Sequence, residues 1–269
     1  MVVQHNMTAS NTNRQLGITT GSLAKSTEKL SSGYKINRAG DDAAGLSISE
    51  KMRSQIRGLD QASNNAEDGI SLIQTAEGAL NEIHSMLQRM NELSVKAAND
   101  TNQSIDRSAI QDEVDALSSE VTRIASSTQF NKMNLFTSTK ILSLQIGANK
   151  SQSIGLSLTK ITAATLSVSK LSMKSHKAAN SAITKVQTAI NKVSQQRSSL
   201  GALQNRLEYT ISNLDSSSEN TQAAESRIRD VDMASEMVKY SKNNILMQAG
   251  QSMLAQANSQ TQGVLSLLG

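Results

Sequence analysis

A heptad repeat of apolar residues between residues 175 and 225 constrains the fold of this chain more than any other sequence feature. Two rows, three residues apart, make up the repeat: Ile183, Ile190, Arg197, Gln204 and Ile211, and Val186, Val193, Leu200, Leu207 and Leu214. Apolar residues at this spacing over several heptads indicate a coiled-coil helix. The polar Arg197 and Gln204 lower the stability of the seam but can fix its register.

Two more long helices are predicted nearer the start of the chain. Over residues 45–98 two heptad rows recur: Met52, Leu59, Ala66, Ile73, Leu80, Leu87 and Ser94, and Gly69, Ala76, Ile83, Met90 and Ala97. Asp41 and Asp42 mark the N-terminal boundary, because carboxylates there meet unpaired N–H groups and the helix dipole. After a turn at 99–102, a helix over 104–126 carries Ile110, Val114, Leu117, Val121 and Ile124. We expect three antiparallel helices to share one seam.

The composition favours long helices and excludes several kinds of site. None of the 269 residues is proline, which breaks helix interiors, and none is cysteine, which excludes disulfides and thiolate ligands. Lys and Arg are interleaved with Asp and Glu, as on solvated helix faces rather than a nucleic-acid-binding patch. The three histidines lie far apart, and no catalytic or phosphate-binding motif is present. We therefore expect no enzymatic activity, metal, cofactor or nucleic-acid partner.

The hydrophobic period changes from helical to alternating after residue 140. Leucine and isoleucine then occupy every second position in two runs: Leu142, Leu144 and Ile146, and Ile154, Leu156 and Leu158. This alternation predicts a β-hairpin near 141–158, with a loop at 147–150 somewhat longer than the minimum. Residues 159–174 are rich in Ser, Thr and Lys, and we expect them to form a surface connection to the last coiled-coil helix.

Both ends of the chain combine an apolar face with very few charges. Residues 243–269 contain no charged side chain, and Arg14 is the one certain charge among the first 24 residues. The apolar faces are Leu16, Leu23 and Leu30 at the start, and Leu246, Gly250, Met253, Ala257, Val264 and Leu268 at the end. Neutral amides can pair inside a dry interface, whereas charges are costly to bury there. We therefore expect helices that order when packed among copies of the chain.

Two other interpretations of the ends remain. A disordered tail is one, although such tails are usually charged and poor in Leu and Met. A membrane anchor is the other, but glutamines throughout 248–262 argue against membrane insertion. The start of the chain shows no secretory signal, and no stretch is apolar enough to span a bilayer.

Motifs over nearly the whole chain resemble bacterial flagellin, the filament subunit of the flagellum. They are Leu30–Asn37, Asp41–Ile48, Gln55–Leu59, Asn65–Leu72, Gln74–Leu80, Leu144–Asn149, Leu200–Arg206 and Val264–Leu268. The resemblance implies a mainly α fold: a long coiled-coil-like helical bundle with a small β-hairpin, plus a discontinuous terminal-helix domain. Residues 1–40 and 230–269 would form the two halves of an inner filament-core domain, and 41–229 the bundle, without the outer variable domains of larger flagellins.

The resemblance also implies partners and a location. It implies a homo-polymer, the helical filament used for swimming, with assembly carried by Leu16, Leu23, Leu30, Leu246, Met253 and Leu268. Such subunits leave the cell unfolded through the flagellar type III export apparatus, without a cleaved signal peptide and with the help of an export chaperone. They then join filament cap and hook-junction proteins outside the cell.

One motif resembles the site that a host innate receptor reads in flagellins. Its residues are Gln88, Arg89, Glu92 and Leu93 on the first bundle helix, and Ile110, Gln111 and Glu113 on the facing helix. The resemblance implies binding to Toll-like receptor 5, and the leucine-rich end resembles what inflammasome sensors read. An Arg that makes paired bonds beside a Leu suits an interface, although packing within the filament explains the same residues.

Two alternatives to a flagellin stay open at this stage. A hook–filament junction protein resembles flagellin at both ends but departs from it in the middle. A signalling coiled coil, such as a chemoreceptor hairpin, would carry heptads throughout, without an alternating hairpin or charge-free ends.

Overall fold

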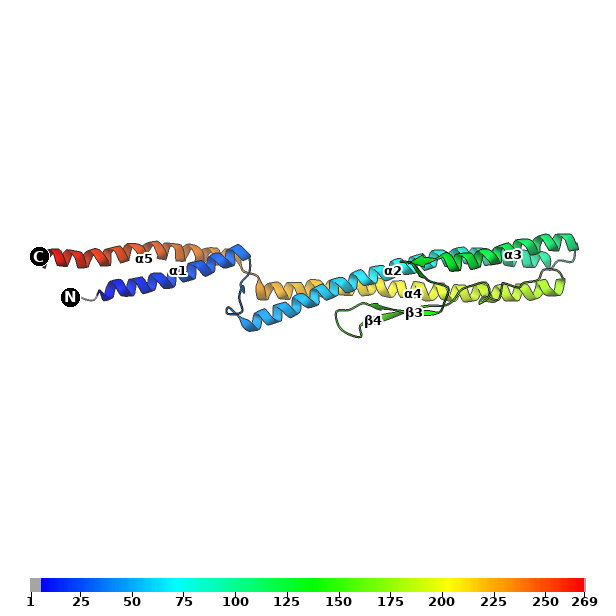
Figure 1. Ribbon diagram of the computed structural model, residues 1–269, viewed down its shortest axis with the longest axis horizontal. Coiled ribbons are helices and arrows are strands. Elements are labelled where there is room, and N and C mark those ends of the chain that lie inside the picture. The colour runs from blue at the N-terminus through cyan, green and yellow to red at the C-terminus, as the bar shows by residue number, and fades with distance from the viewer. Residues whose placement is uncertain (1–5, 269) are drawn as a thin grey trace. The chain divides into compact units, whose positions relative to one another are not determined.

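The computed structural model describes residues 6–268, apart from the side chains of residues 261, 262 and 264–268. It is mainly helical, as predicted (Figure 1). Its elements are α1 (Met7–Ser32), α2 (Ala43–Ala97), α3 (Ser104–Ser127), β1 (Gln129–Phe130), β2 (Met133–Asn134), β3 (Lys140–Gln145), β4 (Ser153–Leu158), α4 (His176–Arg229) and α5 (Met233–Leu268).

The chain divides into two compact units. Unit 1 comprises residues 1–55 and 219–269, and unit 2 comprises residues 56–218. The division falls inside α2 and α4, whereas the predicted boundaries at 40/41 and 229/230 fall between helices. The three-segment division therefore stays a prediction.

Unit 2 has a main apolar core built by α2, α3, α4 and the hairpin, and a smaller apolar cluster of Leu59, Ala62 and Leu214. The predicted seam of α2 is confirmed over residues 59–97, because Ile73, Leu80, Leu87 and their neighbours in both rows are buried. Hydrogen bonds from Ser63 to Asp215 (3.1 Å) and from Ser218 to Asp60 (2.8 Å) join α2 and α4 in opposite chain directions. Apolar burial on this scale is the main stabilising contribution in a long bundle.

One row of the predicted α4 seam is confirmed as buried, and the other is half-buried, with Ile190 and Ile211 packed against the core. Val186, Val193, Leu200, Leu207 and Leu214 are buried as expected. A second buried row runs one residue before the half-buried one, through Ala182, Ala189 and Gln196. The hairpin and the chain that follows it lie against this side of α4, because the Gln196 side chain donates to the Ser157 carbonyl and accepts from Thr159.

The hairpin has the predicted strands and packs on α2. Strands β3 and β4 are antiparallel, with Leu142 opposite Leu156 and Leu144 opposite Ile154. The Asn65 side chain on α2 donates to the Gln145 carbonyl at 3.0 Å. Gly69 leaves the space that Leu144 fills, since a Cβ there would lie 2.6 Å from Leu144 Cδ1.

The expected surface connection at 159–174 is wrong, because this connecting segment is part of the core. Six apolar side chains are each at most 4% exposed: Ile161, Ala163, Leu166, Val168, Leu171 and Met173. Both the amide nitrogen and the amide oxygen of Gln111 on α3 bond to the backbone of this segment. The side chain donates to the Leu171 carbonyl at 2.8 Å and accepts from the Met173 N–H at 2.7 Å.

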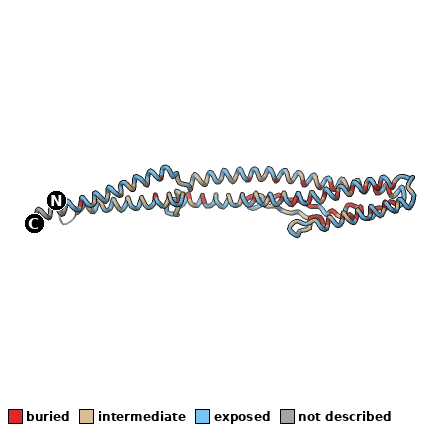
Figure 2. Tube along the Cα trace, turned by 90° about the horizontal axis from the view of Figure 1, so that it is seen from above, coloured by how far each residue is buried: buried red, intermediate tan, exposed pale blue. Residues whose placement is uncertain are grey.

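Unit 1 contains the antiparallel pair α1 and α5. Ser26 on α1 donates to Glu236 near the start of α5, and Asn6 before α1 donates to the Ala257 carbonyl farther along α5. Buried positions are sparse on these two helices and frequent in the bundle (Figure 2). The terminal pair therefore leaves far more of its side chains uncovered than the helices of unit 2 do.

A short link joins α1 to the start of α2 within unit 1. Gly33 ends α1 in the left-handed conformation (φ 76°), and the Asp42 side chain accepts from the Gly45 N–H at 2.9 Å to cap α2. The capping role expected of the Asp41–Asp42 pair is thus confirmed for Asp42, whereas Asp41 accepts from the N–H groups of Asn37 and Arg38 in the preceding turn. Hydrogen bonds from the backbone of Arg38 and then Asn37 lower the pKa of Asp41, which keeps it ionised as part of this turn.

Candidate assembly surface

Helix α5 carries apolar side chains on every side, whereas α1 covers one side. The covered row recurs every three or four residues: Glu236, Tyr240, Asn243, Met247, Gly250, Leu254 and Ala257. At about 100° per residue, Met233 and Met237 lie on one flank of this row, Leu246 and Met253 on the other, and Val238 and Ile245 opposite. These six apolar side chains are between 47% and 70% exposed. A helix that is apolar all round is typical of a buried helix.

Leu16 of α1 packs against Gly250 of α5 at the centre of the pair. A Cβ built at position 250 would lie 3.3 Å from Leu16 Cδ1. Beside this contact lies a groove of about 410 Å³, lined by Asn11, Thr12, Gln15, Leu16, Thr19, Leu246, Ala249, Gly250 and Met253. The groove is open to solvent along an apolar flank of α5.

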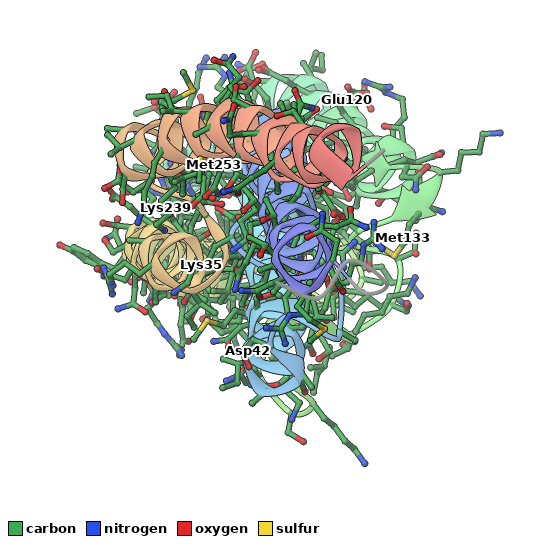
Figure 3. The ribbon with its side chains drawn as sticks, turned by 90° about the vertical axis from the view of Figure 1, so that its left-hand side faces the viewer. Lys35, Asp42, Glu120, Met133, Lys239 and Met253 are labelled. Carbon is green, nitrogen blue, oxygen red and sulfur yellow. The ribbon has the colours of Figure 1, made fainter. Side chains whose placement is uncertain are left out.

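The residues predicted to carry assembly fall into two groups. Leu16, Leu23 and Leu30 are half-buried. Leu246 and Met253 are exposed, and Met253 is labelled on α5 in Figure 3. The side chains of Val264 and Leu268 lie outside the described residues.

A buried carboxylate fixes the register of α1 against α5. Glu236 is 4% exposed, accepts from Ser26 Oγ at 2.8 Å and pairs with Lys239 at 3.1 Å. Burial is the largest influence on the pKa of Glu236 and raises it, but the bonds from Ser26 and Lys239 together lower the pKa below its usual value. The ionised form therefore stabilises the helix pair.

Four of the receptor-motif residues lie on the exposed surface of α2 and α3. Arg89 pairs with Glu113 of α3 at 2.9 Å and with Glu92 at 3.1 Å. The bond that Arg89 donates to Glu113, followed by the one it donates to Glu92, raises the pKa of Arg89. The exposed Gln88 contacts His84 one turn earlier at 3.1 Å. This arrangement presents a preorganised guanidinium with carboxylates on both helices.

The other three receptor-motif residues are engaged inside unit 2. Leu93 and Ile110 are 3% and 6% exposed and belong to the core. Gln111 is half-buried, with both ends of its amide bonded to the connecting segment. The structure therefore joins Arg89, Glu92 and Glu113 by ion pairs and presents these three and Gln88 outward, with Leu93 and Ile110 in the core.

Comparison with known proteins identifies the family of the chain. The profile described as the bacterial flagellin N-terminal helical region matches residues 3–141, and that of the bacterial flagellin C-terminal helical region matches residues 183–268. The chain belongs to the bacterial flagellin family. It is 55% identical to a flagellin of Halalkalibacterium halodurans over 271 residues, covering 100% of both chains. It is 52% identical to the flagellar filament 33 kDa core protein of Treponema phagedenis, again with 100% of both chains covered.

Solved structures show the same architecture. The crystal structure of Bacillus cereus flagellin matches 60% of this chain and 94% of its own, with a TM-score of 0.50 and 32% identity. A putative flagellar hook-associated protein from Vibrio parahaemolyticus matches 71% of this chain and 100% of its own at a TM-score of 0.58. Its identity of 11% shows the fold alone.

Membership of the flagellin family makes this chain a structural protein rather than an enzyme, as the sequence predicts. Within the described residues of this flagellin, no helix has the length and hydropathy needed to cross a membrane.

Sequence reasoning missed part of the candidate assembly surface of this flagellin. Met237, Val238 and Ile245 were outside the predicted apolar face, because that face was drawn as a single row. The sequence could have indicated them, since these apolar residues stand at helical positions that a single partner helix cannot cover. The pairing of Ser26 with Glu236 joins residues 210 apart in the sequence, which no local pattern indicates.

Proposed function

We propose that this flagellin is a subunit of the flagellar filament and that the exposed sides of α5 are where copies join. The observation that supports the proposal is the distribution of apolar residues around α5, of which α1 covers one side. A second copy is the occupant that suits these sides, because filament core proteins are among the full-length relatives.

The absence of charge after residue 242 supports the same proposal. Residues 243–269 carry neutral amides and hydroxyls between their apolar side chains. Neutral amides can hydrogen-bond to one another when water is excluded, whereas a buried unpaired charge costs several kcal/mol. The segment can therefore be surrounded by other chains on the sides that α1 leaves open.

Replacement of Ile245 by glutamine tests the proposal on the full chain. Ile245 is 65% exposed on the side of α5 opposite α1, so the change leaves the helix pair intact. Losing the burial of one isoleucine, about 1.5–3 kcal/mol, is expected to raise the critical concentration for polymerisation at least about tenfold. Light scattering after addition of filament seeds, with electron microscopy of the product, measures it.

The matched control is Ile105→Gln on α3, where the isoleucine is 77% exposed. It removes the same apolar surface from unit 2, and we expect polymerisation close to that of the unchanged chain. Equal critical concentrations for both variants would contradict a role of α5 in joining copies.

We further propose that the filament lies outside the cell and serves swimming motility. The subunit would pass the export apparatus with its export chaperone and then meet the filament cap and hook-junction proteins. Deleting the chromosomal copy and restoring either the unchanged or the Ile245→Gln chain tests this. We expect swimming and sheared extracellular filaments with the first and neither with the second.

We also propose recognition by Toll-like receptor 5 through the exposed part of the receptor motif. The supporting observation is that Arg89 is held by Glu113 and Glu92 on the surface of two helices. Arg89→Ala is expected to weaken receptor activation at least about tenfold, as for an interface hot spot. The control is Arg123→Ala, which removes an exposed arginine paired with Glu120 on the same unit. Recognition of the leucine-rich end by inflammasome sensors remains a proposal on residues whose side chains are not described.

A further inference from the structure

The methionines of this chain are distributed unevenly between its two units. The chain has eleven, and among the described residues the exposed ones are Met7, Met233, Met237 and Met253, on α1 and α5. In unit 2, Met90 and Met173 are fully buried and Met86 and Met133 are half-buried. The exposed thioethers therefore lie on the helix pair that carries the candidate assembly surface.

These thioethers are the most oxidisable exposed groups in the described residues. The chain contains no cysteine, so no thiol competes for an oxidant. A thioether sulfur reacts with a peroxide according to its access to solvent. The exposed fractions of 74% at Met7, 63% at Met253, 50% at Met237 and 48% at Met233 leave all four residues accessible from solvent.

We propose that Met7, Met233, Met237 and Met253 form a reversible oxidation site through which peroxide prevents the free subunit from joining a filament. The inference rests on the proposed function, because it requires that copies join through α5. The sulfur lone pair attacks one peroxide oxygen, so that an S–O bond forms and the O–O bond breaks. The sulfur loses two electrons, and the leaving oxygen takes the remaining proton to become water.

The position of Met253 explains why the product opposes assembly. Met253 lines the groove together with Leu16 and Leu246, so a partner seated there would contact its sulfur. The sulfoxide is polar and strongly hydrated, and it loses that hydration when a dry contact forms without a hydrogen-bond donor. Met233 and Met237 place the same chemistry on the opposite flank of the covered row.

Assembly would in turn protect these groups. Once α5 is enclosed by neighbouring copies, peroxide can no longer reach its sulfur atoms. The site would therefore act on subunits before incorporation and leave a completed filament unaffected.

The first part of the test is oxidation of the full-length free subunit with hydrogen peroxide, followed by peptide mass spectrometry. We expect Met7, Met233, Met237 and Met253 to be converted at least about tenfold faster than Met90 and Met173. Equal rates at exposed and buried positions would overturn the assignment of the site.

The second part compares polymerisation before and after oxidation. Sulfoxides at the contact are expected to raise the critical concentration about tenfold or more, and treatment with methionine sulfoxide reductases of both epimer classes should restore it. A variant with leucine at all four positions should polymerise and resist peroxide, because Leu and Met have similar volumes. The control, Met86→Leu with Met133→Leu, should remain peroxide-sensitive.

The outcomes separate the two proposals. If the untreated chain fails to polymerise, the proposed function is wrong. If it polymerises and the oxidised chain does so equally well, or if the four-leucine variant is as sensitive as the control, the oxidation site is wrong while the proposed function stands.

Discussion

Replacing Gln111 by alanine removes the two hydrogen bonds that tie the connecting segment to α3. These bonds, of 2.8 Å to the Leu171 carbonyl and 2.7 Å from the Met173 N–H, satisfy backbone groups next to buried side chains. Each such bond contributes about 0.5–1.5 kcal/mol net, so we expect a loss of about 1–3 kcal/mol of unfolding free energy. In a domain of this size that corresponds to a fall in melting temperature of about 2–4 °C for each kcal/mol.

The assay is thermal unfolding followed by circular dichroism, together with hydrogen exchange at the Met173 amide. Gln88→Ala is the matched control, because it makes the same change of helix propensity on α2, where the exposed side chain bonds to His84 one turn earlier. We expect the control to unfold within about 0.5 kcal/mol of the unchanged chain. If both variants unfold at the same temperature and the Met173 amide exchanges at its original rate, the two hydrogen bonds of Gln111 do not stabilise the fold.

Three further changes test other parts of the structure. Gly69→Ala places a Cβ 2.6 Å from Leu144 and should cost about 1–3 kcal/mol in urea unfolding, whereas Gly78→Ala, with nothing within 4 Å, should stabilise by about 0.5–1 kcal/mol. The pKa of Glu236 lies below its ordinary value of 4.5, so its contribution is complete above that value and lost as pH falls through the lower folded-state pKa. Protection of the α1 and α5 amides, measured by hydrogen exchange relative to the intrinsic exchange rates, should fall in acid, and Glu236→Gln should show a smaller acid dependence. Arg229 stacks on the Tyr34 ring at 4.7 Å from its centroid and pairs with Glu50 at 2.7 Å. Arg229→Lys should destabilise unit 1 by about 0.5–2 kcal/mol in thermal unfolding, since a lysine cannot both stack on Tyr34 and form the same planar ion pair.

The helices and the hairpin could be predicted from the sequence because their signals are local. The row from Val186 to Leu214 repeats at a fixed period within one helix, and the alternation from Leu142 to Leu158 repeats within one hairpin. A side chain's direction follows from its position in such an element. Periodicity therefore placed these elements within a few residues of their bounds in the structure.

The connecting segment could not be predicted in the same way. From Ile161 to Met173 its apolar residues are spaced by two or three positions and separated by Ser, Thr and Lys. No regular element has this period, and the segment takes its conformation from the surface of the bundle and from the Gln111 side chain. The same cause buried a second row of α4, through Ala182, Ala189 and Gln196.

The receptor motif, too, could be predicted only in part from the sequence. The sequence placed Arg89 and Glu113 on facing helices, and the structure pairs them at 2.9 Å. Which motif residues face outward depended on packing between helices, and this buried Leu93 and Ile110.

The sequence by itself determined the helices of this protein, its hairpin, its family and the charge-free character of its ends, because each of these follows from a local pattern or a motif. Tertiary structure alone decided which neighbour covers which face. It paired Ser26 with Glu236, buried the connecting segment and left α5 apolar on the sides that α1 does not reach. The physical reason is that burial depends on contacts between residues far apart in the chain, whereas periodicity specifies only that a face is apolar.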